Sequence, residues 1–183
     1  EFRLRHLNDP RARAVVEAAA AKAGWRGGAG DGVRGWGFAF ARYKNIGNYV
    51  ALAARVSVEA EVRVERVVAA IDCGRVVNPD GVTNQAEGGI VQAASWTLKE
   101  RVAFDRTRIT SRDWESYPIL TFAEVPEIDT VLLDRPEESW MGVGEGMVGP
   151  TAAAIGNAVA NALGVRVRDL PLTRERVIAA MQA

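Results

Sequence analysis

The residues with the clearest chemical potential lie in one glycine-rich stretch, GVGEGMVGP at 142–150, which leads straight into the apolar sequence TAAAIGNAVANAL. Residues 144–149 fit the pattern G-x-G-x-x-G, which binds dinucleotide phosphates where it opens a helix. The second position of this pattern is Glu145, however, and its negative charge would face the phosphates. The stretch is therefore either a phosphate-binding loop or a loop that presents a carboxylate.

The dinucleotide interpretation has support as well as objections. A helix is expected after the glycines, and Asp169 follows at about the 20-residue separation of a ribose-binding acid. The preceding residues EESWM do not have the composition of a buried parallel strand, and the residues after Asp169 are too few for the rest of a doubly wound sheet. A nucleotide-binding module that uses residues 144–149 is therefore the less favoured alternative.

The carboxylate interpretation gives the acid a function. The four glycines allow backbone N–H groups to approach a ligand closely while one side chain is held at a fixed angle. Apolar neighbours would exclude water from Glu145 and favour its use as a general base; they are Val143, Met147 and Val148. A tight turn, in which the glycines serve only backbone geometry and Pro150 begins the helix, is equally consistent with the residues.

The composition limits the other classes of function. The chain has 183 residues, 48% of them hydrophobic, and its 23 basic and 23 acidic side chains balance. We therefore expect a folded globular core, and neither a nucleic-acid partner nor a membrane span. The sole cysteine, Cys73, and the sole histidine, His6, are too few for a structural zinc or an iron–sulfur cluster, so no metal ligand is assigned to the chain. We expect Cys73 to be a buried thiol and His6 to be solvated.

The pattern of elements predicts an α+β fold with an antiparallel, hairpin-centred sheet packed with helices. A helix over 9–25 is indicated by the cap Asp9, by Pro10 and by Gly24 at its end, and the link GGAGDG follows it. The remaining expected elements are strands at 36–43, 48–60 and 61–74, with the last two joined by a turn near 60–61, a helix within 82–105, a short strand at 130–136, and helices at 151–163 and 173–183, the last capped by Thr173.

The segment around the predicted helix in 82–105 contains further turn-forming and glycine residues. Asn78-Pro79-Asp80-Gly81 indicates a turn before the helix. Its apolar face is expected to hold Val82, Ile90, Val91, Ala94, Leu98 and Val102. The pair Gly88-Gly89 would destabilise the helix unless another group must come close to its backbone. The following residues, 105–130, are expected to be irregular and pinned by aromatic side chains, among them Trp114, Tyr117 and Phe122.

Two stretches together resemble a known family. VVAAIDCGRVVNPDGVTNQAEGGIVQAASWTLKE resembles the D-x-G…N-P…Q-x-E-G-G segment of the molybdenum hydroxylases, the xanthine oxidase and aldehyde oxidase family. GVGEGMVGPTAAAIGNAVANAL looks like the G-x-G-E loop of that family and the helix after it. With FRLRHLNDPRARAVVEAAAAKAGW and GWGFAFARYKNIGNYVALAARVSVE, the likeness covers nearly the whole chain and is greatest to the large subunit of the isoquinoline 1-oxidoreductase type.

The resemblance implies a fold and a site. The fold would be molybdopterin-binding-domain-like, with residues 1–183 as a single domain from the C-terminal part of the large subunit: an N-terminal helix and link at 1–30, and a core at 31–183 that carries the Glu145 loop. Glu145 would be the general base of a hydroxylation that uses oxygen from water. The cofactor would be contacted by Gln85, Gly142, Val143 and Gly144. Glu87 is interpreted as a structural acid, and Gly88 and Gly89 would allow close packing under the site.

The resemblance also implies a cofactor and partners. The cofactor would be molybdopterin with molybdenum, in its cytosine dinucleotide form, and its dithiolene would hold the metal without a protein thiolate. Partners would be the remaining large-subunit segments and a small subunit with [2Fe-2S] clusters, and the substrate would be an N-heteroaromatic compound or an aldehyde. The chain alone would bind no cofactor and be inactive. A non-catalytic assembly domain is the other alternative. Gly146 departs from the family pattern, which usually has proline directly after the glutamate.

Overall fold

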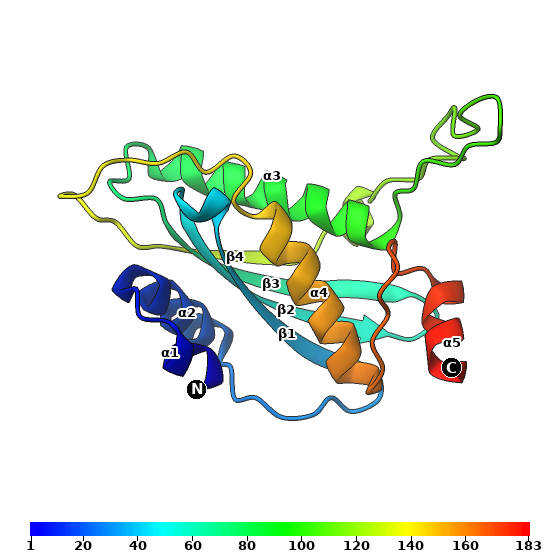
Figure 1. Cartoon of the computed structure of the whole chain (residues 1–183), viewed down its shortest axis with the longest axis horizontal. Coiled ribbons are helices and arrows are strands. Elements are labelled where there is room, and N and C mark those ends of the chain that lie inside the picture. Colours follow the sequence, from blue (N-terminus) through cyan, green and yellow to red (C-terminus); the bar gives the residue numbers. More distant parts are fainter.

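A computed structural model describes residues 1–183 and shows a four-stranded sheet with helices on both faces (Figure 1). The strands lie in the order β1 (Arg34–Arg42), β2 (Tyr49–Val58), β3 (Val62–Asp72) and β4 (Glu127–Leu132). The helices are α1 (Phe2–His6), α2 (Pro10–Ala23), α3 (Pro79–Leu98), α4 (Val148–Leu163) and α5 (Arg174–Gln182). Two single 3-10 turns, η1 (Tyr43–Asn45) and η2 (Phe122–Glu124), complete the elements. None of the helices has the length and apolar character that a membrane crossing requires.

The predicted α+β class and the central hairpin are confirmed. The strands β1, β2 and β3 pair antiparallel, and β2 and β3 are joined by the residues between Val58 and Val62, where the turn was expected. The fourth strand pairs parallel to β3 and begins three residues earlier than predicted, at Glu127. Along β2 and β3, alternate side chains face opposite sides of the sheet. One face therefore packs against α2 and the other against α3 and α4.

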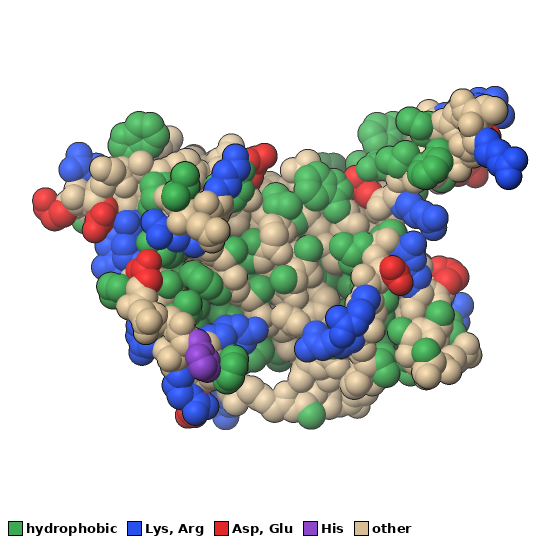
Figure 2. Space-filling view, in the orientation of Figure 1, with side chains coloured by type: hydrophobic (Ala, Val, Ile, Leu, Met, Phe, Trp, Pro, Cys, Tyr) green, Lys and Arg blue, Asp and Glu red, His purple; other side chains and the backbone are tan.

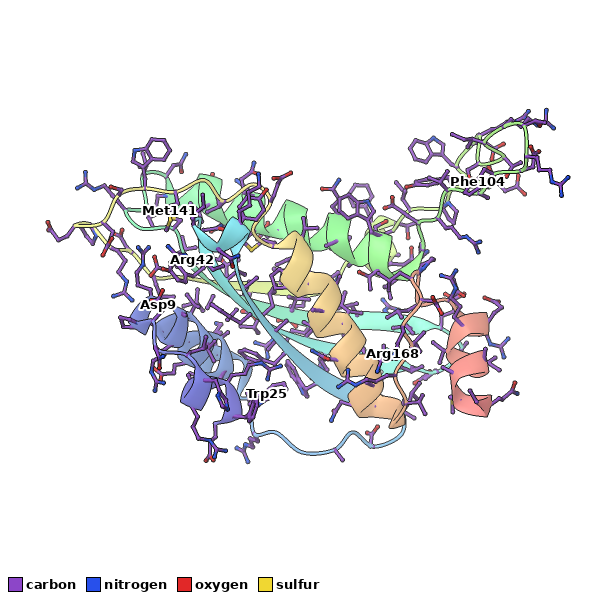
Figure 3. The ribbon with its side chains drawn as sticks, viewed as in Figure 1. Asp9, Trp25, Arg42, Phe104, Met141 and Arg168 are labelled. Carbon is purple, nitrogen blue, oxygen red and sulfur yellow. The ribbon has the colours of Figure 1, made fainter.

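Helix α2 has the ends that the sequence predicted. Asp9 accepts hydrogen bonds from the backbone N–H groups of Arg11 and Ala12, Pro10 is the first helical residue, and Gly24 ends the helix in the left-handed conformation. These ends satisfy backbone groups that a helix terminus leaves unpaired. The labelled Asp9 and Trp25 mark the two ends of this helix in Figure 3. The short helix α1 before it was not predicted, because five residues carry too little periodicity to indicate a helix.

Helix α3 differs from the prediction at both ends. Asn78 accepts a hydrogen bond from the Gly81 N–H at 3.0 Å, so the expected turn is the N-terminal cap and first turn of the helix. The helix ends at Leu98, which leaves Val102 outside it and exposed. The remaining apolar-face residues are buried, except for the half-buried Val91. Asn-Pro-Asp-Gly suits a turn and a helix start equally well, so local pattern could not separate them.

The segment after α3 projects from the body of the molecule (Figures 1 and 2). Phe104, labelled on this projection in Figure 3, is 75% exposed, and so is Trp114. Phe122 is fully exposed, whereas Tyr117 is half-buried and its hydroxyl donates to Glu100. The expectation that aromatic side chains pin this segment to the core is therefore wrong for Trp114 and Phe122. Aromatic residues predict burial only where a packed surface lies within reach.

The contact between β1 and α4 depends on glycine. A Cβ at Gly37 would overlap the carbonyl oxygen of Ala154 and the backbone nitrogen of Ala158 in α4. At Gly35 it would lie 2.5 Å from the backbone nitrogen of Ala162. The helix backbone therefore rests directly on the strand, and this close approach sets the height of α4 above the sheet.

We expect Gly37→Ala to lower the free energy of unfolding by about 2 kcal/mol or more, because backbone atoms cannot move aside as a side chain can. Urea denaturation of the chain measures the change. The matched control is Gly156→Ala in α4, where a Cβ meets nothing within 4 Å. That change should stabilise the helix by about 0.5–1 kcal/mol. Equal stability of the two variants would contradict the proposed close contact.

Candidate functional site

The glycine-rich loop is held by the end of β3. The Arg135 N–H donates to the Gly74 carbonyl at 3.1 Å, and the Met141 N–H donates to the Cys73 carbonyl at 2.8 Å. The chain then passes through Gly142 and enters α4 at Val148 (Figure 1). Pro150 is the third residue of α4, so the expectation that it would be the first helical residue is wrong. A hydrogen-bonded turn precedes Pro150, because the Val148 N–H donates to the Glu145 carbonyl at 3.3 Å.

Side chains of the loop divide between the core and the surface. Val143 and Met147 are buried in the cluster that includes α3 and α4, whereas Glu145 is exposed. The expectation that apolar neighbours exclude water from Glu145 is therefore wrong for this chain, because Val143 and Met147 point into the core and the half-buried Val148 leaves Glu145 exposed. The burial of Val143 and Met147 instead fixes the backbone on both sides of Glu145, so the loop does present a carboxylate.

The hydroxyl of Tyr43 donates a hydrogen bond to Oε2 of Glu145. This bond is the main cause of a raised pKa of Tyr43, because a neighbouring carboxylate stabilises the protonated phenol. Tyr43 follows β1 directly and belongs to η1. Sequence reasoning missed it, since the two residues are 102 positions apart and no local pattern connects them.

Gln85 and Gly144 lie together, as the implied cofactor contacts required. Gln85 is exposed on α3, and its Oε1 would be 3.4 Å from a Cβ at Gly144. A cavity of about 850 Å³ opens beside both residues and extends along α3 to Phe122. Gly142 is exposed and has open space where a side chain would be. Val143 can contribute only backbone atoms, because its side chain is buried.

Of the two adjacent glycines in α3, Gly88 and Gly89, only Gly89 contacts the Glu145 loop. A Cβ at Gly89 would lie 3.2 Å from Cβ of Met147, so this glycine allows α3 to pack under the loop. Gly88 has open space around it and needs no such explanation, which corrects the expectation for this residue. Glu87 is half-buried beside the cavity.

Gly146 is pressed against the buried side chain of Asn48. A Cβ at Gly146 would be 2.6 Å from Oδ1 of Asn48 and would overlap Nδ2. Proline has a Cβ, so the proline that the resemblance implies at position 146 would collide with Asn48 in this chain. Both polar atoms of the Asn48 amide are buried without a hydrogen-bond partner. An unpaired buried amide costs free energy unless a ligand, a further segment or water satisfies it.

Other candidate residues lie outside this site. Cys73 is buried and burial raises the pKa of its thiol, while His6 is exposed, as the sequence predicted for both. No group of three or more histidine, cysteine, aspartate or glutamate side chains is arranged to hold a metal ion. The dinucleotide alternative requires a strand that ends at the glycine loop, and no strand lies between Leu132 and α4.

Comparison with known proteins identifies similar sequences. Residues 11–126 match the family model of the molybdopterin cofactor-binding domain. A nicotinate dehydrogenase subunit from Pseudomonas putida is 44% identical over 99% of this chain and 17% of its own length. The beta subunit of isoquinoline 1-oxidoreductase from Brevundimonas diminuta is 36% identical over 94% of this chain and 22% of its own length.

The solved structures agree with the sequence relatives. Quinoline 2-oxidoreductase from Pseudomonas putida 86 superposes with a TM-score of 0.69 and 32% identity, over 74% of this chain and 19% of that one. The chain thus spans about a fifth of the length of these relatives.

Proposed function

Because the chain belongs to the molybdopterin cofactor-binding domains of the molybdenum hydroxylase large subunits, we propose that its Glu145 loop and α3 form one side of the cofactor and substrate site of such an enzyme. The observation that carries the proposal is the meeting of Gln85 and Gly144 at one edge of a large cavity, with Gly144 directly preceding Glu145 in the loop. These residues come from two stretches that lie far apart in the sequence. Both stretches carry the sequence resemblance to the family.

The residues at the loop fit a polar cofactor. The amide of Gln85 offers a donor and an acceptor beside Gly144, and the backbone of Gly142 has open space around it. The unpaired amide of Asn48 lies directly beneath the same loop. A cofactor that brings its own metal ligands suits a site in which no cluster of protein ligands is present. When bound, the molybdenum cofactor would supply the two-electron oxidation of the substrate.

Glu145 would act as general base in this proposal. Oε2 accepts the hydrogen bond from Tyr43, so Oε1 remains free to take a proton. The proton would come from the water-derived oxygen as that oxygen attacks an electron-poor carbon of the substrate. The glycines on each side leave space for the reacting groups to approach Glu145 closely.

The names of the relatives guide the proposed substrate and partners. Those proteins are named for nicotinate, isoquinoline and quinoline, so we propose an N-heteroaromatic substrate, with an aldehyde as the alternative. The cytosine dinucleotide form of molybdopterin, the remaining large-subunit segments and a small subunit with [2Fe-2S] clusters complete the proposed enzyme. Electrons from the substrate would leave through those clusters.

Substitution of Gln85 tests the cofactor side of the site. In the intact enzyme that contains this chain, Gln85→Ala should lower kcat/KM by about 10- to 100-fold, which is the usual cost of removing a polar partner at a metal site. Because Gln85 is exposed, the variant should fold normally. Steady-state kinetics and metal analysis of the purified enzyme measure both consequences.

The matched control is Gln182→Ala, because Gln182 is exposed on α5 and does not line the cavity. This variant should keep kcat/KM within about twofold. If both glutamine variants had the same kinetics, Gln85 would have no special part in the site.

A further inference from the structure

The β1–β2 connection at residues 43–48 contacts the Glu145 loop at two points. Tyr43 donates to Glu145, and Asn48 lies against Gly146. In Figure 1, η1 lies next to the segment that enters α4. The general-base proposal uses the Tyr43 bond only to identify Oε1 as the free oxygen, and it assigns Tyr43 no role of its own. Together the two contacts support Glu145 and the residue that follows it.

The backbone of Tyr43 is fixed within the connection. Its N–H donates to the Asn48 carbonyl at 2.9 Å, and its own carbonyl accepts from the N–H of Gly47 at 2.7 Å. Between them, Lys44 and Asn45 adopt left-handed backbone with φ of 50° and 61°. Non-glycine residues adopt this region at an energetic cost and only where the surrounding structure holds them there. The phenol is therefore presented from a rigid turn.

The phenol restricts a side chain that would otherwise move freely. An exposed glutamate has several accessible rotamers, and ordering it costs conformational entropy. The bond to Oε2 selects one orientation before any substrate binds. The charged groups near the phenol are the Glu145 carboxylate and Lys44, whose Nζ lies 5.2 Å from the ring centroid. The carboxylate raises the pKa of Tyr43, so the phenol remains a hydrogen-bond donor at neutral pH.

We propose that Tyr43 is a positioning residue that holds Glu145 through Oε2 and thereby directs Oε1 towards the reacting oxygen. The catalytic part of this inference rests on the proposed function of Glu145. The contact between the two side chains does not, and it can be measured without turnover.

The contact is tested by the titration of the tyrosines. The chain has three, and the hydroxyls of Tyr49 and Tyr117 also donate to carboxylates, those of Asp9 and Glu100, each at 2.8 Å. With 13C-labelled tyrosine in the full chain, NMR follows each phenol separately. Glu145→Gln should lower the pKa of Tyr43 and leave the other two unchanged, because it removes the charge that stabilises the protonated phenol. An unchanged Tyr43 titration would overturn the proposal.

The positioning role is tested by Tyr43→Phe in the intact enzyme. We expect kcat to fall by about 10- to 100-fold, as a misdirected catalytic group typically costs, with KM within about twofold and molybdenum content unchanged. Tyr49→Phe removes a tyrosine–carboxylate bond on the α2 face of the sheet, away from the cavity beside α3, and should keep kcat within about twofold. A rise in KM with kcat unchanged would overturn the proposal, because it would assign Tyr43 to substrate binding.

The comparison with Glu145→Gln separates the two proposals. Full activity of Tyr43→Phe beside an inactive Glu145→Gln would overturn the positioning role and leave the general base in place. Activity retained in Glu145→Gln would overturn the general base and the positioning role together. Loss in both, with the KM and titration results above, supports both.

Discussion

Glu145→Gln in the intact enzyme is expected to abolish turnover while molybdenum content stays near that of the wild type. The change replaces one carboxylate oxygen by an NH2 group and keeps the size of the side chain, so the loop and its buried neighbours Val143 and Met147 should remain in place. A glutamine cannot accept the proton, and loss of a general base typically lowers the rate by 10²–10⁴-fold. Steady-state kinetics and metal analysis on the same preparation separate a chemical defect from loss of the cofactor.

Glu87→Gln is the control, since Glu87 is an acid that lines the cavity and its interpretation is structural. We expect its kcat to stay within about threefold of the wild type. If Glu145→Gln kept activity within about tenfold, or if Glu87→Gln were the inactive variant, the assignment of the base to Glu145 would be wrong.

Features with local causes were predictable from the sequence. The ends of α2 follow from Asp9, Pro10 and Gly24, whose effects act within one helical turn. The β2–β3 hairpin follows from two neighbouring alternating segments. The loop before α4 follows from its glycines and the apolar helix after them, although the exposure of Glu145 was not predicted.

Features with distant causes were not predictable. Tyr43 bonds to Glu145, which lies 102 positions away in the sequence. The close contact between Gly37 and the α4 backbone likewise joins two distant segments. The side chains of Val143 and Met147, two residues before and after Glu145, are buried in the core, a direction that apolar character alone does not give. The absence of a side chain at position 146 is likewise explained by the contact with Asn48. Asn48 precedes the β2–β3 hairpin in sequence, whereas Gly146 follows it. Each of these depends on tertiary packing, which overrides local propensity.

Asp72 of the D-x-G motif is another residue whose role depends on contacts that are distant in the sequence. The resemblance to the family assigned it no role, and the structure places its side chain fully buried at the end of β3. It accepts hydrogen bonds from Nε of Arg11 at 3.1 Å, Nε of Arg135 at 3.2 Å and the Gly74 N–H at 3.0 Å. Although burial opposes ionisation, these donors hold the pKa of Asp72 below its usual range. Asp72 thus joins α2 to the segment that leads into the Glu145 loop.

Asp72→Asn should therefore be among the most destabilising single changes in the chain, by about 3 kcal/mol or more at pH 7, since it leaves two arginines without their buried partner. Urea denaturation of the chain measures it. The control is Asp129→Asn, because Asp129 pairs with Arg66 and Lys22 but is 22% exposed. A partly exposed pair of this kind should contribute about 1 kcal/mol or less.

The stabilisation that Asp72 provides depends on pH. A carboxylate with a lowered pKa in the folded state stabilises that state fully above its unfolded pKa, about 3.9, and the stabilisation is lost as pH falls through the folded pKa. The difference in unfolding free energy between wild type and Asp72→Asn should accordingly be constant from about pH 5 to 7 and shrink below about pH 4. If the difference persisted undiminished in acid, the effect of Asp72 would come from the size and packing of its side chain rather than from its charge.

The Asp72→Asn variant should also become sensitive to proteases between Leu133 and Gly142, because Arg135 and the backbone of Cys73 and Gly74 hold the segment that leads to Glu145. Limited proteolysis at pH 7 would detect this change.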